Sequence, residues 1–273
     1  MSDQKIQIRN NTMNCIVFTK QNSQDTIEAR VQNNNVWPTA TFTFRHFSIR
    51  QDNTAMKAGT DGVLLGAWCD LYNATQILDI GTGTGLIALM AAQRTENAIV
   101  TAIEIDQDAY HQALENIYNS KYKDRITVIN TDFRDYCNSK HLTFSHIVSN
   151  PPFFTETTGS PDKKRMLARQ AESLPFNVLI KGVAKLLMPG GKFSVVIPWG
   201  EKLDFVRLCA LNGLHLCRKT AVISREGREP IRALLTFSNE ILPLTQHFLT
   251  IRDRDGHYTM PYKCLTGDFY LKF

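Results

Sequence analysis

The residues best suited to chemistry in this chain form the run Ser149-Asn150-Pro151-Pro152-Phe153-Phe154. The side-chain carbonyl of Asn150 and the main-chain carbonyl of Pro151 can each accept one N–H of a planar amine. Two acceptors outside the amine plane favour a pyramidal nitrogen and hold its lone pair toward an electrophile. Pro151 and Pro152 together stiffen the loop, and the ring of Phe153 offers a face for stacking a nucleobase. The run predicts group transfer to a planar amine nitrogen, although Asn-Pro-Pro taken alone also fits an ordinary turn.

A second motif, Asp79-Ile80-Gly81-Thr82-Gly83-Thr84-Gly85, precedes this run. Gly81, Gly83 and Gly85 let the backbone approach a ligand closely, because no Cβ stands in the way. Asp79 comes just before them and can accept a hydrogen bond from the ammonium of a bound amino-acid moiety. NAD is the other cofactor of such folds, but its fingerprint needs G-x-G-x-x-G and this chain has G-x-G-x-G. The two motifs together predict an N-methyltransferase that uses S-adenosylmethionine.

Two further carboxylates come where the rest of that cofactor would need them. Glu104 ends an apolar run about twenty residues past the glycines, where a ribose diol is usually held. Ile105 would then pack on the adenine. Asp132 follows the next apolar run and would accept from the adenine amino group, and Phe133 would line the same face. Each carboxylate alone also fits a helix N-cap or a surface position, but their register after successive strands favours ligand binding.

Strands and helices must alternate to bring these motifs to one edge of a sheet. The apolar pattern predicts strands at 77–80, 99–103, 126–130, 146–149 and 193–197. It predicts helices at 63–68, 86–94, 107–119 and 175–187, the first with an N-cap candidate within 60–62. The runs 214–223 and 231–237 flank a turn-rich segment and predict an antiparallel C-terminal hairpin that closes one edge. This rhythm is typical of an α/β, Rossmann-like fold with a doubly wound, mostly parallel sheet.

The composition divides the chain into a polar extension and a catalytic domain. Residues 1–40 are rich in Asn and Gln with poor periodicity, and we expect a loosely ordered extension; residues 41–273 form the predicted methyltransferase domain. No run of about twenty apolar residues predicts a membrane span, and the N-terminus does not resemble a secretory signal. The six cysteines form no Cys-x-x-Cys pair. We therefore expect reduced thiols, a cytoplasmic location and no metal site.

The whole chain has a formal net charge of +5, and its positive charge is concentrated toward the C-terminus. Residues 1–153 hold 13 Lys and Arg against 15 Asp and Glu, a balance of −2, whereas residues 154–273 hold 18 against 11, a balance of +7. Four of these cations lie in the loop just after the Asn-Pro-Pro-Phe run: Lys163, Lys164, Arg165 and Arg169. They suit contacts with RNA phosphates, and a solvated loop explains them equally well on sequence alone.

Three segments resemble the bacterial valine-tRNA adenine-37 N6-methyltransferases, a family of seven-stranded class I methyltransferases. The segments are 42–47 leading into 56–68, then 79–94, then 149–154, with weaker support from 268–271. The glycine loop and Asn-Pro-Pro-Phe recur across many methyltransferases, whereas the part from Lys57 to Trp68 is more particular to this family. The extension before residue 41 departs from the family pattern, and the family often has Tyr in place of Phe153, which stacks equally well.

The resemblance implies methylation of N6 of adenosine 37, next to the anticodon of a valine tRNA, with S-adenosylmethionine as the donor. It places Thr60 and Asp61 beside the methionine end of the cofactor, where the start of a helix would offer free N–H groups to a carboxylate. It also implies a seven-stranded sheet and favours RNA as the partner of the basic loop.

Other functions share these motifs. Release-factor glutamine methyltransferases carry Asn-Pro-Pro-(Phe/Tyr) but usually have a helical N-terminal domain, for which residues 1–40 are too short and too polar. Ribosomal-RNA guanine N2-methyltransferases carry it too, often with a duplicated domain that this sequence lacks. A non-catalytic RNA-binding module is disfavoured by the intact Asn150 and glycine loop. The sequence leaves the oligomeric state open.

Overall fold

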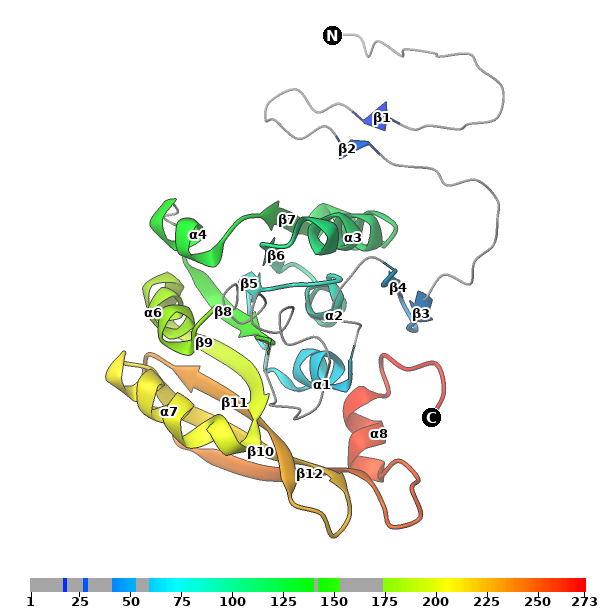
Figure 1. Ribbon diagram of the computed structural model, residues 1–273, viewed down its shortest axis with the longest axis vertical. Coiled ribbons are helices and arrows are strands. Elements are labelled where there is room, and N and C mark those ends of the chain that lie inside the picture. Colours follow the sequence, from blue (N-terminus) through cyan, green and yellow to red (C-terminus); the bar gives the residue numbers. More distant parts are fainter. Residues whose placement is uncertain (1–16, 19–26, 29–40, 53–58, 140–141, 153–173) are drawn as a thin grey trace, which may run out of the picture. The chain divides into compact units, whose positions relative to one another are not determined.

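The structure is a computed structural model that describes residues 17–18, 27–28, 41–52, 59–139, 142–152 and 174–273 (Figure 1). The chain divides into two compact units, Met1–Thr39 and Ala40–Phe273. In the first unit, β1 (Val17–Phe18) and β2 (Ile27–Glu28) pair antiparallel. The rest of the predicted polar extension lies outside the described residues.

The second unit is built on a sheet of eight strands in the order β12-β10-β11-β9-β8-β5-β6-β7. Their bounds are β5 (Gln76–Ile80), β6 (Ile99–Glu104), β7 (Ile126–Asn130), β8 (Phe144–Ser149), β9 (Leu187–Pro198), β10 (His215–Arg225), β11 (Pro230–Ser238) and β12 (Thr245–Arg252). The strands from β5 to β9 are parallel, and β11 lies antiparallel between β9 and β10. The α/β fold with a mostly parallel, doubly wound sheet is confirmed, but the sheet has eight strands where the resemblance implied seven.

The C-terminal hairpin of β10 and β11 is present, but it does not close the sheet. β12 pairs in parallel with β10 and forms the edge instead. This strand was not predicted, because its first half is exposed and only Leu249 and Ile251 are buried. Alternation of apolar and polar residues is therefore too short to recognise.

Helices cover both faces of the sheet and produce three layers (Figure 1). One face carries α1 (Thr60–Trp68), α2 (Leu86–Arg94), α3 (Gln107–Tyr118) and α8 (Met260–Thr266). The other carries α4 (Phe133–Ser139), α6 (Phe176–Leu186) and α7 (Lys202–Leu211). Each face buries its own cluster of apolar side chains against the sheet, which accounts for the near-continuous apolar strands of the parallel part.

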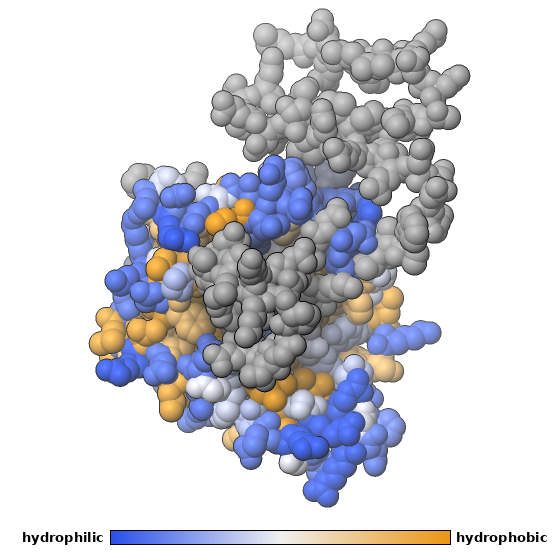
Figure 2. Space-filling model, in the orientation of Figure 1, coloured by the Kyte–Doolittle hydropathy of each residue, from blue (hydrophilic) through white to orange (hydrophobic). Residues whose placement is uncertain are grey.

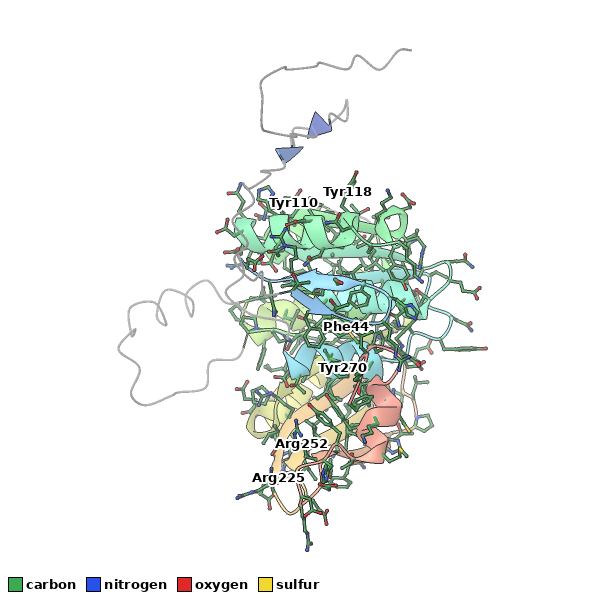
Figure 3. All side chains as sticks on the ribbon, turned by 90° about the vertical axis from the view of Figure 1, so that its right-hand side faces the viewer. Phe44, Tyr110, Tyr118, Arg225, Arg252 and Tyr270 are labelled. Carbon is green, nitrogen blue, oxygen red and sulfur yellow. The ribbon has the colours of Figure 1, made fainter. Side chains whose placement is uncertain are left out.

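The first and last described segments of this unit lie side by side. The short strands β3 (Thr41–Thr43) and β4 (Ser48–Arg50) pair antiparallel, and the backbone between them meets the C-terminal segment. The Arg45 N–H donates to the carbonyl of Phe269 at 2.8 Å, and the Phe44 and Tyr270 rings stack with centroids 5.9 Å apart (Figure 3).

The sheet order reverses between β5 and β8. From β5 the chain winds outward through β6 to β7, and from β8 it winds the other way to β9. Open α/β sheets bind ligands at such a switch point, outside the carboxyl ends of the strands. The glycine loop follows β5 and Asn150 follows β8, so the fold brings the two sequence motifs to this point.

Candidate active site

The glycine loop after β5 has a backbone that only glycine adopts easily. Gly81, Gly83 and Gly85 have φ angles of 70°, 56° and 82°. A Cβ on Gly81 or Gly83 would meet no described atom within 4 Å, so the space beside these two is open. Gly85 differs, since a Cβ there would come within 3.3 Å of the Ile117 side chain of α3. The first two glycines therefore border open space, and the third sets helix packing.

Asp79 is fully buried at the end of β5 and has one oxygen without a partner. Its Oδ2 accepts a hydrogen bond from the Thr82 hydroxyl at 2.6 Å, whereas Oδ1 has no partner among the described residues. Burial raises the pKa of this carboxyl to about 7; the Thr82 hydroxyl and the Ala88 amide lower it, and the negative charge of Glu104 raises it. A buried acceptor of this kind needs a hydrogen-bond donor, and a cationic donor would also stabilise the ionised carboxylate.

Glu104 at the end of β6 holds the glycine loop in place. Its Oε2 accepts from the Gly83 N–H at 2.8 Å, and its Oε1 accepts from the Asp106 N–H at 3.0 Å. Burial raises the pKa of this carboxyl, and backbone donors from Asp106, Gly83 and Ile105 partly offset the rise. Ile105 follows and is 54% exposed, so its side chain is available to cover a ligand.

The two residues after β7 take different positions. Asp132 is half-buried, and its Oδ1 accepts from both the backbone N–H and the side-chain Nε of Arg134, at 2.7 and 3.1 Å. Phe133 begins α4 and is only 4% exposed, packed over Gly182 of α6. The sequence predicted that Phe133 lines the adenine; one part of this ring packs in the core against α6, and its contact with the adenine stays a prediction.

Asn150 follows β8 and carries a second unpaired buried oxygen. Its Oδ1 has no hydrogen-bond partner among the described residues. The preceding Ser149 donates from its hydroxyl to the carbonyl of Ile80 at 3.0 Å, which ties the end of β8 to the residue before the glycine loop. Pro151 is buried and Pro152 is exposed. The remaining predicted residues of this region lie outside the described residues: Phe153, Lys163, Lys164, Arg165 and Arg169.

Thr60 and Asp61 form the first turn of α1. The N-cap of this helix is Gly59, without a side-chain cap, so the predicted cap within 60–62 is wrong by one residue. Asp61 forms an ion pair with Arg232 of β11, with Oδ2 and Nε 2.8 Å apart. The start of α1 is thereby fixed to the antiparallel part of the sheet.

Comparison with known proteins identifies the family. The model of the methyltransferase small domain matches residues 62–205. A protein of Phocaeicola vulgatus named tRNA1(Val) (adenine(37)-N6)-methyltransferase is 44% identical over 235 residues, which cover 86% of this chain and 99% of that protein. One of the same name from Haemophilus influenzae is 43% identical over 233 residues, covering 85% and 99%. The chain belongs to this methyltransferase family.

A solved structure supports the fold of the methyltransferase independently. A predicted O-methyltransferase of Agrobacterium tumefaciens superposes with a TM-score of 0.61 at 21% identity, covering 77% of this chain and 96% of that one. None of the described helices combines the length and apolar character that a membrane crossing requires.

The described residues of the methyltransferase fit S-adenosylmethionine, the methyl donor of the family. The unpaired oxygen of Asp79 suits the ammonium of its methionine part. The open space beside Gly81 and Gly83 leaves room for a ligand against the backbone.

Two residues of the methyltransferase site were not predicted from the sequence. Thr82 supplies the bond to Asp79, and Asn116 of α3 holds the back of the glycine loop. The Asn116 amide is 3% exposed; it donates to the carbonyls of Thr84 and Arg50, both at 2.9 Å, and accepts from the Arg50 N–H at 2.8 Å. Both partners are distant in the chain, so no local pattern could reveal the bonds.

Proposed function

We propose that this methyltransferase transfers the methyl group of S-adenosylmethionine to N6 of adenosine 37 in a valine tRNA. The observation that carries the proposal is the buried, unpaired Oδ1 of Asn150, next to the glycine loop at the switch point of the sheet. Family membership supports the tRNA substrate, since the relatives that share 42–44% identity carry that activity in their names. Action on tRNA would also agree with a cytoplasmic location.

The cofactor would lie along the carboxyl ends of β5, β6 and β7. Asp79 Oδ1 accepts from its ammonium, and Gly81 and Gly83 let it approach the backbone. Glu104 and Asp132 each accept a hydrogen bond from a backbone N–H and keep further lone pairs for a ligand. With these lone pairs Glu104 accepts from the ribose diol, and Asp132 accepts from the adenine amino group. Ile105 covers the adenine, and Thr60 and Asp61 border the methionine end.

The reaction is an in-line displacement in which the protein mainly positions the target nitrogen. When bound, S-adenosylmethionine supplies an electrophilic methyl on a positively charged sulfur. Asn150 Oδ1 and the Pro151 carbonyl accept the two N–H groups of N6 and direct the lone pair at that methyl. The N–C bond forms as the C–S bond breaks, and the nitrogen, now acidic, loses one proton to water. Phe153 would stack the adenine, and the basic loop residues Lys163 to Arg169 would contact phosphates.

The direct test is methyl transfer from labelled S-adenosylmethionine to total tRNA that lacks modifications, followed by nucleoside analysis. We expect N6-methyladenosine at position 37 of valine tRNA. Label in guanine N2 of ribosomal RNA, or in a glutamine of a release factor, with none in tRNA would establish one of the alternative activities instead.

We predict that Asn150→Ala lowers turnover by on the order of 100-fold or more, because one of two acceptors for the target amine is lost. Calorimetric titration should show unchanged affinity for S-adenosylmethionine, since Asn150 is outside the glycine loop. Asn119→Ala, an exposed residue at the far end of α3, is the matched control and should match the parent. Near-normal turnover of Asn150→Ala would contradict the mechanism.

A further inference from the structure

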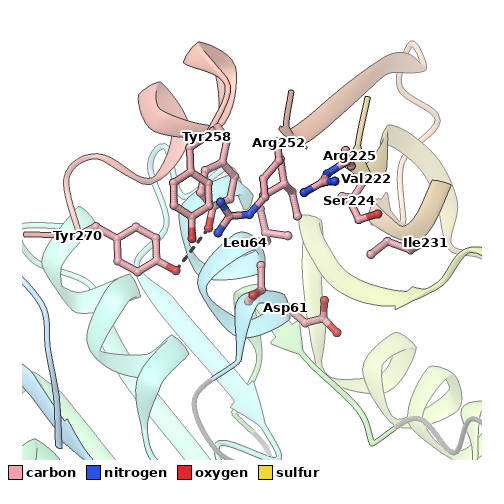
Figure 4. Close-up of a pocket in the computed structure, with 12 residues that line it drawn as sticks. Asp61, Leu64, Val222, Ser224, Arg225, Ile231, Arg252, Tyr258 and Tyr270 are labelled. Carbon is pink, nitrogen blue, oxygen red and sulfur yellow. Dashed lines mark hydrogen bonds between the residues drawn. The ribbon is translucent and has the colours of Figure 1, made fainter. Parts of the chain in front are cut away.

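A pocket of about 420 Å³ opens between α1, α8 and the carboxyl ends of β10 and β12 (Figure 4). Its volume falls within the range of small-molecule sites. Leu64, Ile231 and Ile251 supply apolar wall, and Arg225 and Arg252 supply positive charge. None of the glycine-loop residues lines it, but Thr60 and Asp61 do, so the pocket adjoins the methionine end of the proposed cofactor site.

The two arginines lie next to each other, and the one carboxylate among the residues that line the pocket, that of Asp61, is paired with Arg232. Arg225 and Arg252 are register partners on the parallel strands β10 and β12, and both guanidinium groups lie at the pocket (Figures 3 and 4). Within the described part of the chain, neither forms an ion pair with a carboxylate. Like charges side by side in a sheet are destabilising. An anion in the pocket would remove this repulsion.

Arg252 is oriented before any ligand arrives. Its Nη1 donates to the Gly256 carbonyl at 2.6 Å, and its guanidinium lies over the Tyr258 ring, 4.0 Å from the centroid. Tyr258 in turn stacks on Tyr262 of α8 at 5.0 Å. Such a fixed guanidinium loses little conformational freedom on binding, which favours affinity. The Arg225 carbonyl accepts a hydrogen bond from the Arg228 N–H at 3.0 Å, whereas the Arg225 guanidinium makes no hydrogen bond with the described residues and remains available.

The pocket lies on the same edge of the sheet as the proposed methyl-transfer site. Thr60 and Asp61 line it, and Asp61 pairs with Arg232, whose register partner Pro198 ends β9. β9 neighbours β8, which leads into Asn150. The end of β10 is three strands from that of β8, about 15 Å across the sheet at the usual spacing. Lys219 is level with Ser149, and Arg225 lies six residues further along β10, so the two ends are roughly 25 Å apart, which several nucleotides of RNA can span. Hydrophilic residues gather at this end of the described surface, over the turns after β10 and β12 (Figure 2).

We propose that this pocket binds one phosphodiester of the substrate RNA, several nucleotides from the methylated adenosine. The inference rests on the proposed function. Arg225 and Arg252 donate to the phosphate oxygens, for which the planar guanidinium is well matched. The attached nucleoside packs on the apolar wall around Leu64 and Ile231.

The first test is the salt dependence of tRNA binding by Arg225→Gln and by Arg225→Gln/Arg252→Gln. We expect the log–log slope to fall by about one unit and affinity to fall roughly tenfold, with unchanged affinity for S-adenosylmethionine. The single variant guards against misfolding, because the guanidinium that it removes makes no hydrogen bond with the described residues, and the backbone bond from the Arg228 N–H to the Arg225 carbonyl is kept. Lys181→Gln/Arg207→Gln removes two exposed charges from α6 and α7, the other face of the sheet, and should keep the parent slope.

The second test locates the contacted phosphate. Full-length tRNA is assembled with one neutral methylphosphonate at each position around the target adenosine in turn. At the contacted phosphate the parent should lose roughly tenfold in affinity, and Arg225→Gln should lose almost nothing more.

The outcomes separate this inference from the proposed function. If the parent methylates tRNA while both arginine variants keep its affinity and slope, the pocket assignment is overturned and the function stands. The same holds if every methylphosphonate weakens parent and Arg225→Gln equally. A parent that neither binds nor methylates tRNA overturns both.

Discussion

Asp79 is a residue whose position suits cofactor binding but lowers the stability of the ligand-free protein. A carboxyl that is fully buried, with one oxygen unpaired, favours its neutral form, and its pKa of about 7 reflects that burial. The unfolded chain would ionise the same group near the ordinary value of about 4. Above that pH, burial of Asp79 lowers the free energy of unfolding, because the folded protein resists ionisation of this carboxyl. A cation bound beside Asp79 offsets this loss of stability.

We predict that affinity for S-adenosylmethionine rises with pH from about 5.5 to about 7. Below its pKa, Asp79 carries a proton that must leave before an ammonium can bind, so affinity falls by up to about tenfold per unit of pH well below that pKa. Calorimetry in two buffers of different ionisation enthalpy would measure the released proton. Asp79→Asn should bind weakly with no proton release in this range; a slope equal to that of the parent would assign the titration to another group.

Among the elements, those with strong apolar periodicity were predicted well. The helix at 86–94 and the strand at 126–130 match α2 and β7 residue for residue, because the apolar residues of each recur at the spacing of a helix or strand and polar residues follow them. α7 was missed because only Phe205 and Cys209 of its ten residues are buried. β9 begins at Leu187, earlier than predicted, because it includes the turn-forming Pro189-Gly190-Gly191.

The residues of the candidate site also fall into two groups, those that local sequence pattern predicts and those that only tertiary packing reveals. Residues marked by local pattern, such as Asp79 and Asn150, fall at the ends of the predicted strands and come together at the switch point. The bonds from Asn116 to the glycine loop, and from Gly83 to Glu104, depend on how α3 and β6 pack against it. Contacts set by tertiary packing leave no periodic signal in the chain.

We predict that Asn116→Ala destabilises the fold and loosens the cofactor site together. One buried hydrogen bond, to Thr84, and two half-buried ones, with Arg50, are lost and leave their backbone partners unpaired, which should cost about 2–4 kcal/mol in urea unfolding. Affinity for S-adenosylmethionine should also fall, because the Thr84 carbonyl is released. The exposed neighbour Asn119→Ala should change neither quantity. If Asn116→Ala destabilises the fold but binds S-adenosylmethionine normally, the residue has only a structural role.

At the scale of the whole catalytic unit, the C-terminal residues 268–270 form hydrogen bonds both with the segment 41–52 and with α2. Phe269 and Tyr270 accept bonds from Arg45 through their carbonyls, at 2.8 and 2.9 Å. The Asp268 carbonyl accepts from Gln93 of α2 at 2.9 Å. Phe269 is 2% exposed and belongs to the core cluster beneath α1 and α2. Residues at both ends of the unit therefore complete one core.

We predict that Phe269→Ala lowers the free energy of unfolding by about 3–5 kcal/mol, the usual cost of deleting a buried ring. Thermal or urea unfolding would measure it. Leu271→Ala, two residues on and 54% exposed, should change stability by only a few tenths of a kcal/mol. Equal effects of the two changes would mean that the segment does not contribute to the core in solution.

The position of β12 has a consequence for how the protein behaves at high concentration. Of the described strands only β10 pairs with β12, and the segment that follows covers just the last residues of β12, through the Arg252–Tyr258 bridge and the bond from the Thr259 N–H to the Ile251 carbonyl. The outer backbone groups of the first half of β12 therefore form an open edge. Phe248 is 76% exposed on the strand, and Ile241 just before it is 83% exposed. An apolar strand edge is a template for addition of a strand from another molecule. Self-association and crystal nucleation should therefore begin here, and Phe248→Lys, which uses a charge as natural sheet edges do, should delay both.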